Sequence, residues 1–322
     1  MLDKHIGNLL NQFAAQINTT PLPLAPEKNK TSASLLAAPG KIAANGDSVA
    51  IADSLHHRVL LTDTKGKITQ IFGGGAAGFK DGHASTARFI DLTRRTVTTV
   101  AGNGRKGGAV SAEAKGLEVG LSSPWDVACR DGTLYIAMAG SHQIWRLNAK
   151  SQRIALFAGI GREDIADGKL SEAAFSQPSG LSLFDHWLYV ADAEDSAVRR
   201  IDLRSGREKV ETLVGTGLFD FGDRDGAFAN AKLQHVLGVA ALDENRILIA
   251  DTYNHKLKML DLRSRTVTSL AGNGKPGKEF NLNEPGGLAV LGGTALIADT
   301  NNNRIVSYDL RTGRVSDWPV RQ

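Results

Sequence analysis

The feature that most constrains the fold of this chain is a repeated phrase. A β-rich run that ends in Asp or its equivalent and continues into a polar turn occurs five times. The copies are VAIADSLHHRVLLTD (49–63), LYIAMAGSHQIWRLN (134–148), LYVADAEDSAVRRID (188–202), ILIADTYNHKLKMLD (247–261) and ALIADTNNNRIVSYD (295–309). Because a repeated unit implies a repeated structure, the fold must be an array of similar modules.

Each unit also closes on a short glycine-containing phrase, such as FAGIG or LVGTG. The equivalent glycines are Gly73, Gly102, Gly159, Gly215 and Gly272, at spacings of 29, 57, 56 and 57 residues. Within one unit, runs such as GLSLF, WLYVAD, AVRRID and ETLVG have the length and composition of strands, and Gly, Asp, Asn and Ser separate them. Four short strands per unit at this period predict an all-β fold, a β-propeller with one unit per blade.

The phrase IADTYNHKLKMLD resembles the core of an NHL repeat. More narrowly, SPWDVA, IAMAGSHQIW, QPSGL, LFDFGDRDG, ADTYNHK and EPGGLAV resemble the propeller of the thioredoxin-like, NHL-repeat-containing proteins, over residues 38–315. The resemblance implies a six-bladed NHL propeller that usually follows a thioredoxin-like domain. It also implies that a redox-linked assembly is plausible for such a chain.

This chain departs from that pattern at its N-terminus. Residues 1–37 contain no thioredoxin-like domain, and Cys129 is the only cysteine, so no internal disulfide or redox pair is expected. We expect two parts instead: an N-terminal amphipathic helix with a Pro-rich linker over residues 1–37, and the propeller over 38–322. The helix would gather Ile6, Leu9, Leu10, Phe13 and Ile17 on one face.

A second departure lies in the unit that ends at Gly102. The loop DGHASTARF (81–89) runs directly into IDLTRR at Ile90, whereas DGKLSEAAF (167–175) is followed by two and a half strands before Ile201. About 25 residues are therefore absent, and either the protein has lost them or the sequence lacks residues of the natural molecule. We predict five complete four-stranded blades and one truncated blade over residues 74–102.

Composition sets broad limits on location and partners. The formal net charge is only +4, no apolar run is long enough to span a membrane, and the first residues do not read as a signal peptide. We expect a cytoplasmic monomer without a membrane span.

Several acidic residues raise the question of a metal site. Asp53, Asp192, Asp251 and Asp299 end equivalent strands, where Asp usually accepts backbone N–H bonds and holds a turn. In the central channel, His235 and Glu284 with Trp125 and Asp126 nearby would be the ligands or catalytic groups of a metal-dependent lyase or lactonase. In the loop LFDFGDRDG, Asp220, Asp223 and Asp225 suggest Ca²⁺, although the EF-hand spacing is absent. We expect no cofactor, with a divalent cation such as Ca²⁺ as the alternative, and no catalytic motif supports an enzyme.

Basic residues recur in the turns between the third and fourth strands, which share one face of a propeller. The arginines of this basic rim are Arg94, Arg95, Arg204, Arg207, Arg263, Arg265, Arg311 and Arg314. Such a rim could attract RNA or another anionic ligand, but basic residues are also common at solvent-exposed hairpin turns.

The opposite face carries the long inter-blade loops and is where we expect binding. Candidate binding residues there and at the channel mouth are Trp125, Asp126, Met138, His142, Gln177, Phe219, Phe221, His235, Tyr253 and His255. The sequence thus favours a non-enzymatic scaffold for a protein partner. RNA binding through the basic rim and metal-dependent lyase or lactonase activity remain the alternatives.

Overall fold

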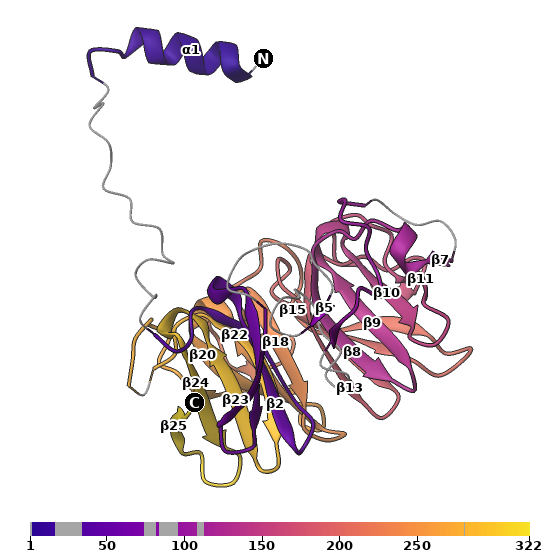
Figure 1. Ribbon diagram of the computed structural model, residues 1–322, viewed down its shortest axis with the longest axis vertical. Helices are drawn as coiled ribbons and strands as arrows, with labels where there is room; N and C mark the ends of the chain where they lie inside the picture. Colours follow the sequence, from indigo (N-terminus) through magenta and orange to yellow (C-terminus); the bar gives the residue numbers. More distant parts are fainter. Residues whose placement is uncertain (1, 17–33, 74–81, 84–95, 108–112, 280) are drawn as a thin grey trace. The chain divides into compact units, whose positions relative to one another are not determined.

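The computed structural model describes residues 2–16, 34–73, 82–83, 96–107, 113–279 and 281–322 (Figure 1). The chain divides into two compact units, residues 1–33 and 34–322. The first unit contains helix α1 (Leu2–Gln12), on which the side chains of Leu9 and Leu10 are exposed. No helix in the described part of the chain is long and apolar enough to cross a membrane.

In the second unit, the described residues form five antiparallel blades, each running from an inner strand outward (Figure 1). The first blade contains β1 (Pro39–Ala44), β2 (Ser48–Asp53), β3 (Arg58–Asp63) and β4 (Ile68–Phe72). The second contains β8 (Pro124–Arg130), β9 (Thr133–Met138), β10 (Gln143–Asn148), β11 (Arg153–Ala158) and the short outer strand β7 (Ala114–Lys115). The third contains β13 (Pro178–Phe184), β14 (Trp187–Asp192), β15 (Ala197–Asp202), β16 (Lys209–Val214) and the outer β12 (Gly168–Lys169).

The last two blades follow the same plan. The fourth contains β18 (Val236–Ala241), β19 (Arg246–Asp251), β20 (Lys256–Asp261), β21 (Thr266–Ala271) and the outer β17 (Gly226–Ala227). The fifth contains β22 (Pro285–Leu291), β23 (Thr294–Asp299), β24 (Arg304–Asp309) and β25 (Val315–Trp318). Short 3-10 helices are η1 (Ser54–His56), η2 (Gly116–Glu118), η3 (Ala139–Ser141), η4 (Thr252–Asn254) and η5 (Thr300–Asn302).

The turns between the third and fourth strands are fixed by Asp or Asn side chains. Asp309 is an example, because its Oδ1 accepts the N–H groups of Arg311 at 3.0 Å and Thr312 at 2.7 Å. Asp261 makes the same pair of bonds to Arg263 and Ser264. This is the turn chemistry for which Asp is favoured, and it allows each strand to pair with the preceding one.

Apolar side chains between neighbouring blades form the core. Tyr189 and Val198 of the third blade, for example, lie in one buried cluster with Val239 and Ile249 of the fourth. The inner strands pack in the order β8, β13, β18, β22 and β1. A Cβ on Gly287 would lie 2.9 Å from Lys41 Cα, so glycine at this inner-strand position lets the blades approach closely.

The ring is interrupted between the first and second blades. β1 and β8 form no packing comparable to that of the other inner strands. Val127 on β8 is 52% exposed, whereas its counterparts in the other four blades are 4% to 9% exposed: Ile42, Leu181, Val239 and Leu288. The apolar face of β8 is therefore uncovered where the other four inner strands are covered by the preceding blade.

The prediction of a six-bladed pattern with a truncated sixth blade is wrong, because the described residues form five blades. Within residues 74–102, the described strands are β5 (Gly82–His83) and β6 (Thr96–Val97), which pair only with each other. The closing phrase instead joins the second blade, since the N–H of Gly102 donates to Gly116 O at 2.9 Å. Because no inner strand is described within residues 74–102, the closing phrase has no four-stranded sheet of its own to join. The sequence junction at Phe89 and Ile90 lies outside the described residues.

Candidate functional site

The aspartate at the end of each second strand anchors the segment ahead of the inner strand. In the fifth blade, Asp299 Oδ1 accepts the N–H of Asn283 at 2.7 Å, and its Oδ2 accepts Arg304 Nε at 2.7 Å. Equivalent N–H bonds of 2.6 to 2.8 Å are made by Asp53 to Ala37, Asp192 to Ser176 and Asp251 to Gln234.

The structural interpretation of these aspartates is therefore confirmed, with one correction. Asp53, Asp251 and Asp299 each precede a 3-10 helix but make no side-chain cap bond to it. They tie two separate segments of one blade together, and Asp251 and Asp299 also accept a side-chain bond from the turn that follows them, from Asn254 and Asn302.

In the third and fourth blades, a fully buried cation completes the anchor. Arg199 Nη1 lies 3.2 Å from Asp192 Oδ2, and Lys258 Nζ lies 3.0 Å from Asp251 Oδ2. Lys258 Nζ is also 2.8 Å from Asp223 Oδ1 and 3.4 Å from Asp225 Oδ1. Burying these charges is tolerated because they are paired and hydrogen-bonded.

The same contacts account for the acidic loop that suggested calcium. Besides its bond to Lys258, Asp225 accepts the N–H of Ser269 at 2.6 Å, and Asp220 pairs with Lys232. The three carboxylates thus bind lysines and the backbone. Among the described residues, no group of three or more His, Cys, Asp or Glu could hold a metal ion.

The second blade replaces the ionic anchor with an apolar one. Met138 stands where the other blades have Asp, and Trp145 stands where Arg199 and Lys258 lie in theirs. Both side chains are buried in one cluster, and Trp145 Nε1 donates to Gln143 Oε1 at 3.0 Å. Met138, a predicted binding residue, therefore lies in the core.

In four of the blades, a residue at the end of the turn between the second and third strands links its blade to the next. His142 Nδ1 accepts the N–H of Gln177 at 3.3 Å, and His255 Nδ1 accepts the N–H of Glu284 at 3.1 Å. Ser196 and Asn303 make the equivalent bonds to His235 and Ala38. We call these four contacts the inter-blade latches, and they give His142 and His255 a structural role.

The equivalent residue of the first blade is His57, beside the interruption. Its side chain is exposed and makes no hydrogen bond to the described part of the chain. The latch is thus absent at the position where no blade follows.

Charged groups occupy the channel at the interruption. Lys41 Nζ donates to Ser179 O and Leu237 O, both at 2.6 Å, and lies 3.8 Å from Asp126 Oδ2. Asp126 Oδ2 also accepts the N–H of Leu181 at 2.9 Å. Burial lowers the pKa of Lys41, and the charge of Asp126 opposes that shift. Asp126, a predicted binding residue, is thus engaged by Lys41 of β1 and by the backbone of β13.

At the channel mouth, two predicted residues form a stacked pair. The rings of His235 and Tyr253 lie 4.3 Å apart at 8°, and Glu194 Oε1 lies 3.7 Å from His235 Nδ1. The pKa of His235 lies below its ordinary value because of burial, and the charges of Glu194 and Glu284 oppose that shift. His235, Tyr253 and Glu284 are thus brought together. The sequence analysis grouped His235 and Glu284 with Trp125 and Asp126 instead, and it missed Glu194.

Exposed aromatic side chains extend this loop-rich face. Phe219 is 92% exposed, and Trp125, Phe221 and Tyr253 also have exposed rings. Phe219 and Phe221 lie on either side of Asp220, which is bound by Lys232 and Thr216. Next to Phe221, Gly222 O accepts Asn254 Nδ2 at 2.6 Å, so this loop is also tied to the turn after β19 of the fourth blade.

The opposite face carries the basic rim. Arg94 and Arg95 lie outside the described residues. Of the described rim arginines, Arg204 alone forms an ion pair, with Asp202; Arg207, Arg263, Arg265, Arg311 and Arg314 are exposed.

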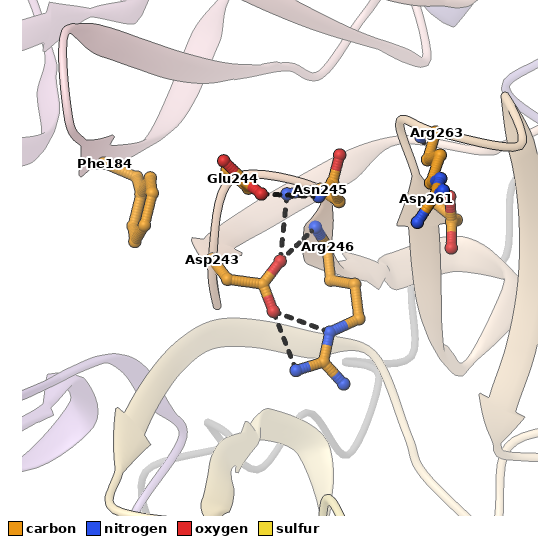
Figure 2. A pocket seen from close by; sticks show the side chains of 7 residues that line it. All are labelled: Phe184, Asp243, Glu244, Asn245, Arg246, Asp261 and Arg263. Carbon is orange, nitrogen blue, oxygen red and sulfur yellow. Dashed lines mark hydrogen bonds and ion pairs between the residues drawn. The ribbon is translucent and has the colours of Figure 1, made fainter.

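A shallow pocket of about 550 Å³ lies on this face between the third and fourth blades (Figure 2). Phe184 lines one side, Arg246 is bonded to Asp243 at 2.7 Å, and Arg263 lies beside Asp261 (Figure 2). The lining charges are mixed, so the pocket favours no single class of ligand.

The arrangement of the blades defines the class of protein as a β-propeller, and comparison with known proteins gives the family. The chain is 38% identical to NHL repeat-containing protein 2 of Gallus gallus over 371 residues, covering 95% of this chain and 51% of that protein. It is 36% identical to Protein SUPPRESSOR OF QUENCHING 1, chloroplastic, of Arabidopsis thaliana, covering 98% of this chain and 35% of that protein. The chain belongs to the NHL-repeat β-propellers, and it spans about half the length of the NHL repeat-containing protein 2 that it matches.

A comparison with solved structures bears on the fold. The solved structure of a Bacteroides thetaiotaomicron protein of unknown function has a TM-score of 0.59 at 17% identity, covering 84% of this chain and 69% of that one. This likeness supports the fold alone. No family model matches the chain.

The match to the chicken relative also bears on the length of the propeller sequence. It spans 371 residues, more than the 322 of this entire chain. The relative therefore carries residues inside the matched region that this chain does not have.

Proposed function

We propose that this propeller is a non-enzymatic scaffold that binds a protein partner through its loop-rich face. The observation that carries the proposal is the set of exposed aromatic rings on that face, with Phe219 at 92% exposure. Large aromatic side chains are enriched in the central parts of protein interfaces, where they supply most of the binding energy. Because polar contacts hold the Phe219 loop, little conformational entropy is lost when it binds.

The remaining details of this proposal rest on sequence. The likeness to thioredoxin-like, NHL-repeat-containing proteins supports a redox-linked assembly as the setting of the scaffold. Cytoplasmic location stays a prediction, since the plant relative carries "chloroplastic" in its name.

The test is affinity capture with the full chain and two matched variants. Phe219→Ser with Phe221→Ser removes the aromatic contact. Arg311→Ser with Arg314→Ser is the matched control, with the same number of serine substitutions on the opposite face. The scaffold account predicts a defined partner retained by the wild-type protein and the arginine variant but lost from the phenylalanine variant. Equal capture by both variants would contradict it. Unchanged thermal unfolding of each variant serves as the folding control.

A second candidate function is binding of an anionic ligand such as RNA at the basic rim. It is favoured by the exposed rim arginines that form no ion pair with other described residues, Arg263 and Arg265 among them. If this candidate is right, the affinity for single-stranded RNA should fall steeply with salt and should weaken in Arg263→Glu with Arg265→Glu. An RNA affinity that depends neither on salt nor on these two substitutions would contradict this candidate function.

A further inference from the structure

The turn after the second strand of the third blade departs from the pattern of its neighbours at one position. Three residues after the anchoring aspartate, the fourth and fifth blades have asparagine. Asn254 Nδ2 donates to Asp251 Oδ2 at 2.8 Å, and Asn302 Nδ2 donates to Asp299 Oδ2 at 2.8 Å. In the third blade this position is Asp195, which follows the anchor Asp192.

Asp195 has no partner that would suit an ionised carboxylate. Its side chain is fully buried, and neither carboxylate oxygen has a hydrogen-bond partner among the described residues. The asparagines at this position donate a second bond, from Asn254 to Gly222 O at 2.6 Å and from Asn302 to Gly277 O at 2.5 Å. The position therefore calls for a donor, and a carboxyl group can donate only when it is protonated.

The charged surroundings of Asp195 come from three segments. Asp192 lies at the end of β14, Arg199 lies on β15, and Glu163 with Asp164 lies on the loop before the third blade. Burial raises the pKa of Asp195, and the charges of Asp164 and Glu163 act in the same direction. The Ser176 hydroxyl and Arg199 lower it, although neither makes a hydrogen bond of regular geometry to the carboxyl.

The single buried cation cannot neutralise both carboxylates. Arg199 pairs with Asp192 at 3.2 Å and also with Asp167 Oδ1 at 2.9 Å, so its charge is already shared. Burial raises the pKa of Asp192 to about 7, and the charge of Asp195 adds to that rise. Two buried carboxylates beside one shared guanidinium favour the uptake of one proton.

We propose that Asp192 and Asp195 hold one proton between them at neutral pH, and that protonated Asp195 takes the donor role of asparagine in the other blades. The proton leaves to solvent when the pair ionises, and both carboxylates are then charged and buried.

The proton would control a turn that belongs to the loop-rich face. Ser196, the next residue, accepts the N–H of His235 at 3.1 Å, and Glu194 lies 3.7 Å from the His235 ring. Loss of the proton leaves two charged carboxylates buried in this turn, and we expect their repulsion to loosen the latch to the fourth blade. The third blade thereby contains a pH-sensitive contact that adjoins the proposed binding face.

The direction of the pH effect follows from the raised pKa of the pair in the folded state. Burial raises the pKa of both carboxyls above the ordinary value of 3.8, that of Asp192 to about 7, so between these values the folded chain holds a proton that the unfolded chain has lost. Its contribution to stability is therefore complete below this range and is lost as pH rises through it. For one proton, the unfolding equilibrium changes by about tenfold per pH unit.

The experiment measures urea unfolding of the full chain across this pH range, together with the infrared band of protonated carboxylic acids. Asp195→Asn supplies the donor without a titrating group. Relative to wild type, this variant should gain stability with rising pH, and it should lack one carboxylic-acid band at neutral pH. The reciprocal variant Asn254→Asp creates the same pair of carboxyls in the fourth blade. It should gain a carboxylic-acid band at neutral pH, and its stability should fall more steeply than that of wild type as the pH rises. It keeps the test decisive should Asp195→Asn fail to fold.

Two results would overturn the proposal. One is a carboxylic-acid band at neutral pH that has the same intensity in wild type and in Asp195→Asn or Asn254→Asp. The other is a pH dependence of stability that is the same in wild type and both variants.

Discussion

The interruption of the ring predicts that one valine behaves differently from its counterpart two blades away. Val127 and Val239 occupy the same inner-strand position, but Val127 is 52% exposed and Val239 is 4% exposed. We compare Val127→Ala with Val239→Ala, which remove the same atoms from the two environments.

The expected magnitudes follow from burial. Two buried carbons contribute about 0.8 kcal/mol each to the transfer free energy, and an unfilled cavity adds to the loss at Val239. Val239→Ala should therefore lower the free energy of unfolding by about 2 kcal/mol. At Val127 roughly half of the transfer term remains and water fills the vacated space, so the loss should stay under about 1 kcal/mol.

The assay is equilibrium urea unfolding followed by tryptophan fluorescence, with far-UV circular dichroism as a second probe. Coincident transitions are needed before the two free energies are compared, because repeat proteins can unfold in parts. Equal losses in the two variants would mean that β8 is covered as fully as β18, and the account of an interrupted ring would be wrong.

Three further predictions concern the anchors. Asp299→Ala removes the acceptor of the Asn283 N–H and the partner of Arg304, so it should lower the free energy of unfolding by about 3 kcal/mol in urea. Met138→Asp buries an unpaired carboxylate and should be strongly destabilising, whereas adding Trp145→Arg should recover part of the loss; a double-mutant cycle with no coupling would count against the equivalence of the two anchors. A chelator should leave the thermal midpoint unchanged, since the four anchoring carboxylates bind N–H groups and protein cations; a fall in the midpoint would show that a metal supports the fold.

Much of the blade architecture could be read from the sequence because it depends on local chemistry. The strands end at Asp or Asn turns that repeat with the unit, and an aspartate such as Asp299 had to satisfy backbone donors nearby. His142 and His255 were placed among the binding residues. Their equivalence to Asn303 at the same repeat position was the available signal that they are latches.

The errors arose where the outcome depends on contacts between distant segments. The family pattern favoured six blades, yet a closing phrase without inner strands cannot form a sheet, and the segment at Gly102 packs on the second blade. Met138 differs from the repeat and so was expected to be functional, but Trp145 changes with it and the pair forms a buried core. Glu194 was missed because only the folded turn brings it beside His235.

The measurement that tests the central claim most directly is site-specific photo-crosslinking in cells. A benzophenone amino acid replaces Phe219 in one variant and Arg311 in another, so that the two faces are sampled under the same conditions. The account predicts crosslinks from position 219 to one defined protein and none to that protein from position 311. Crosslinks confined to position 311, or none from position 219, would contradict the assignment of binding to the loop-rich face.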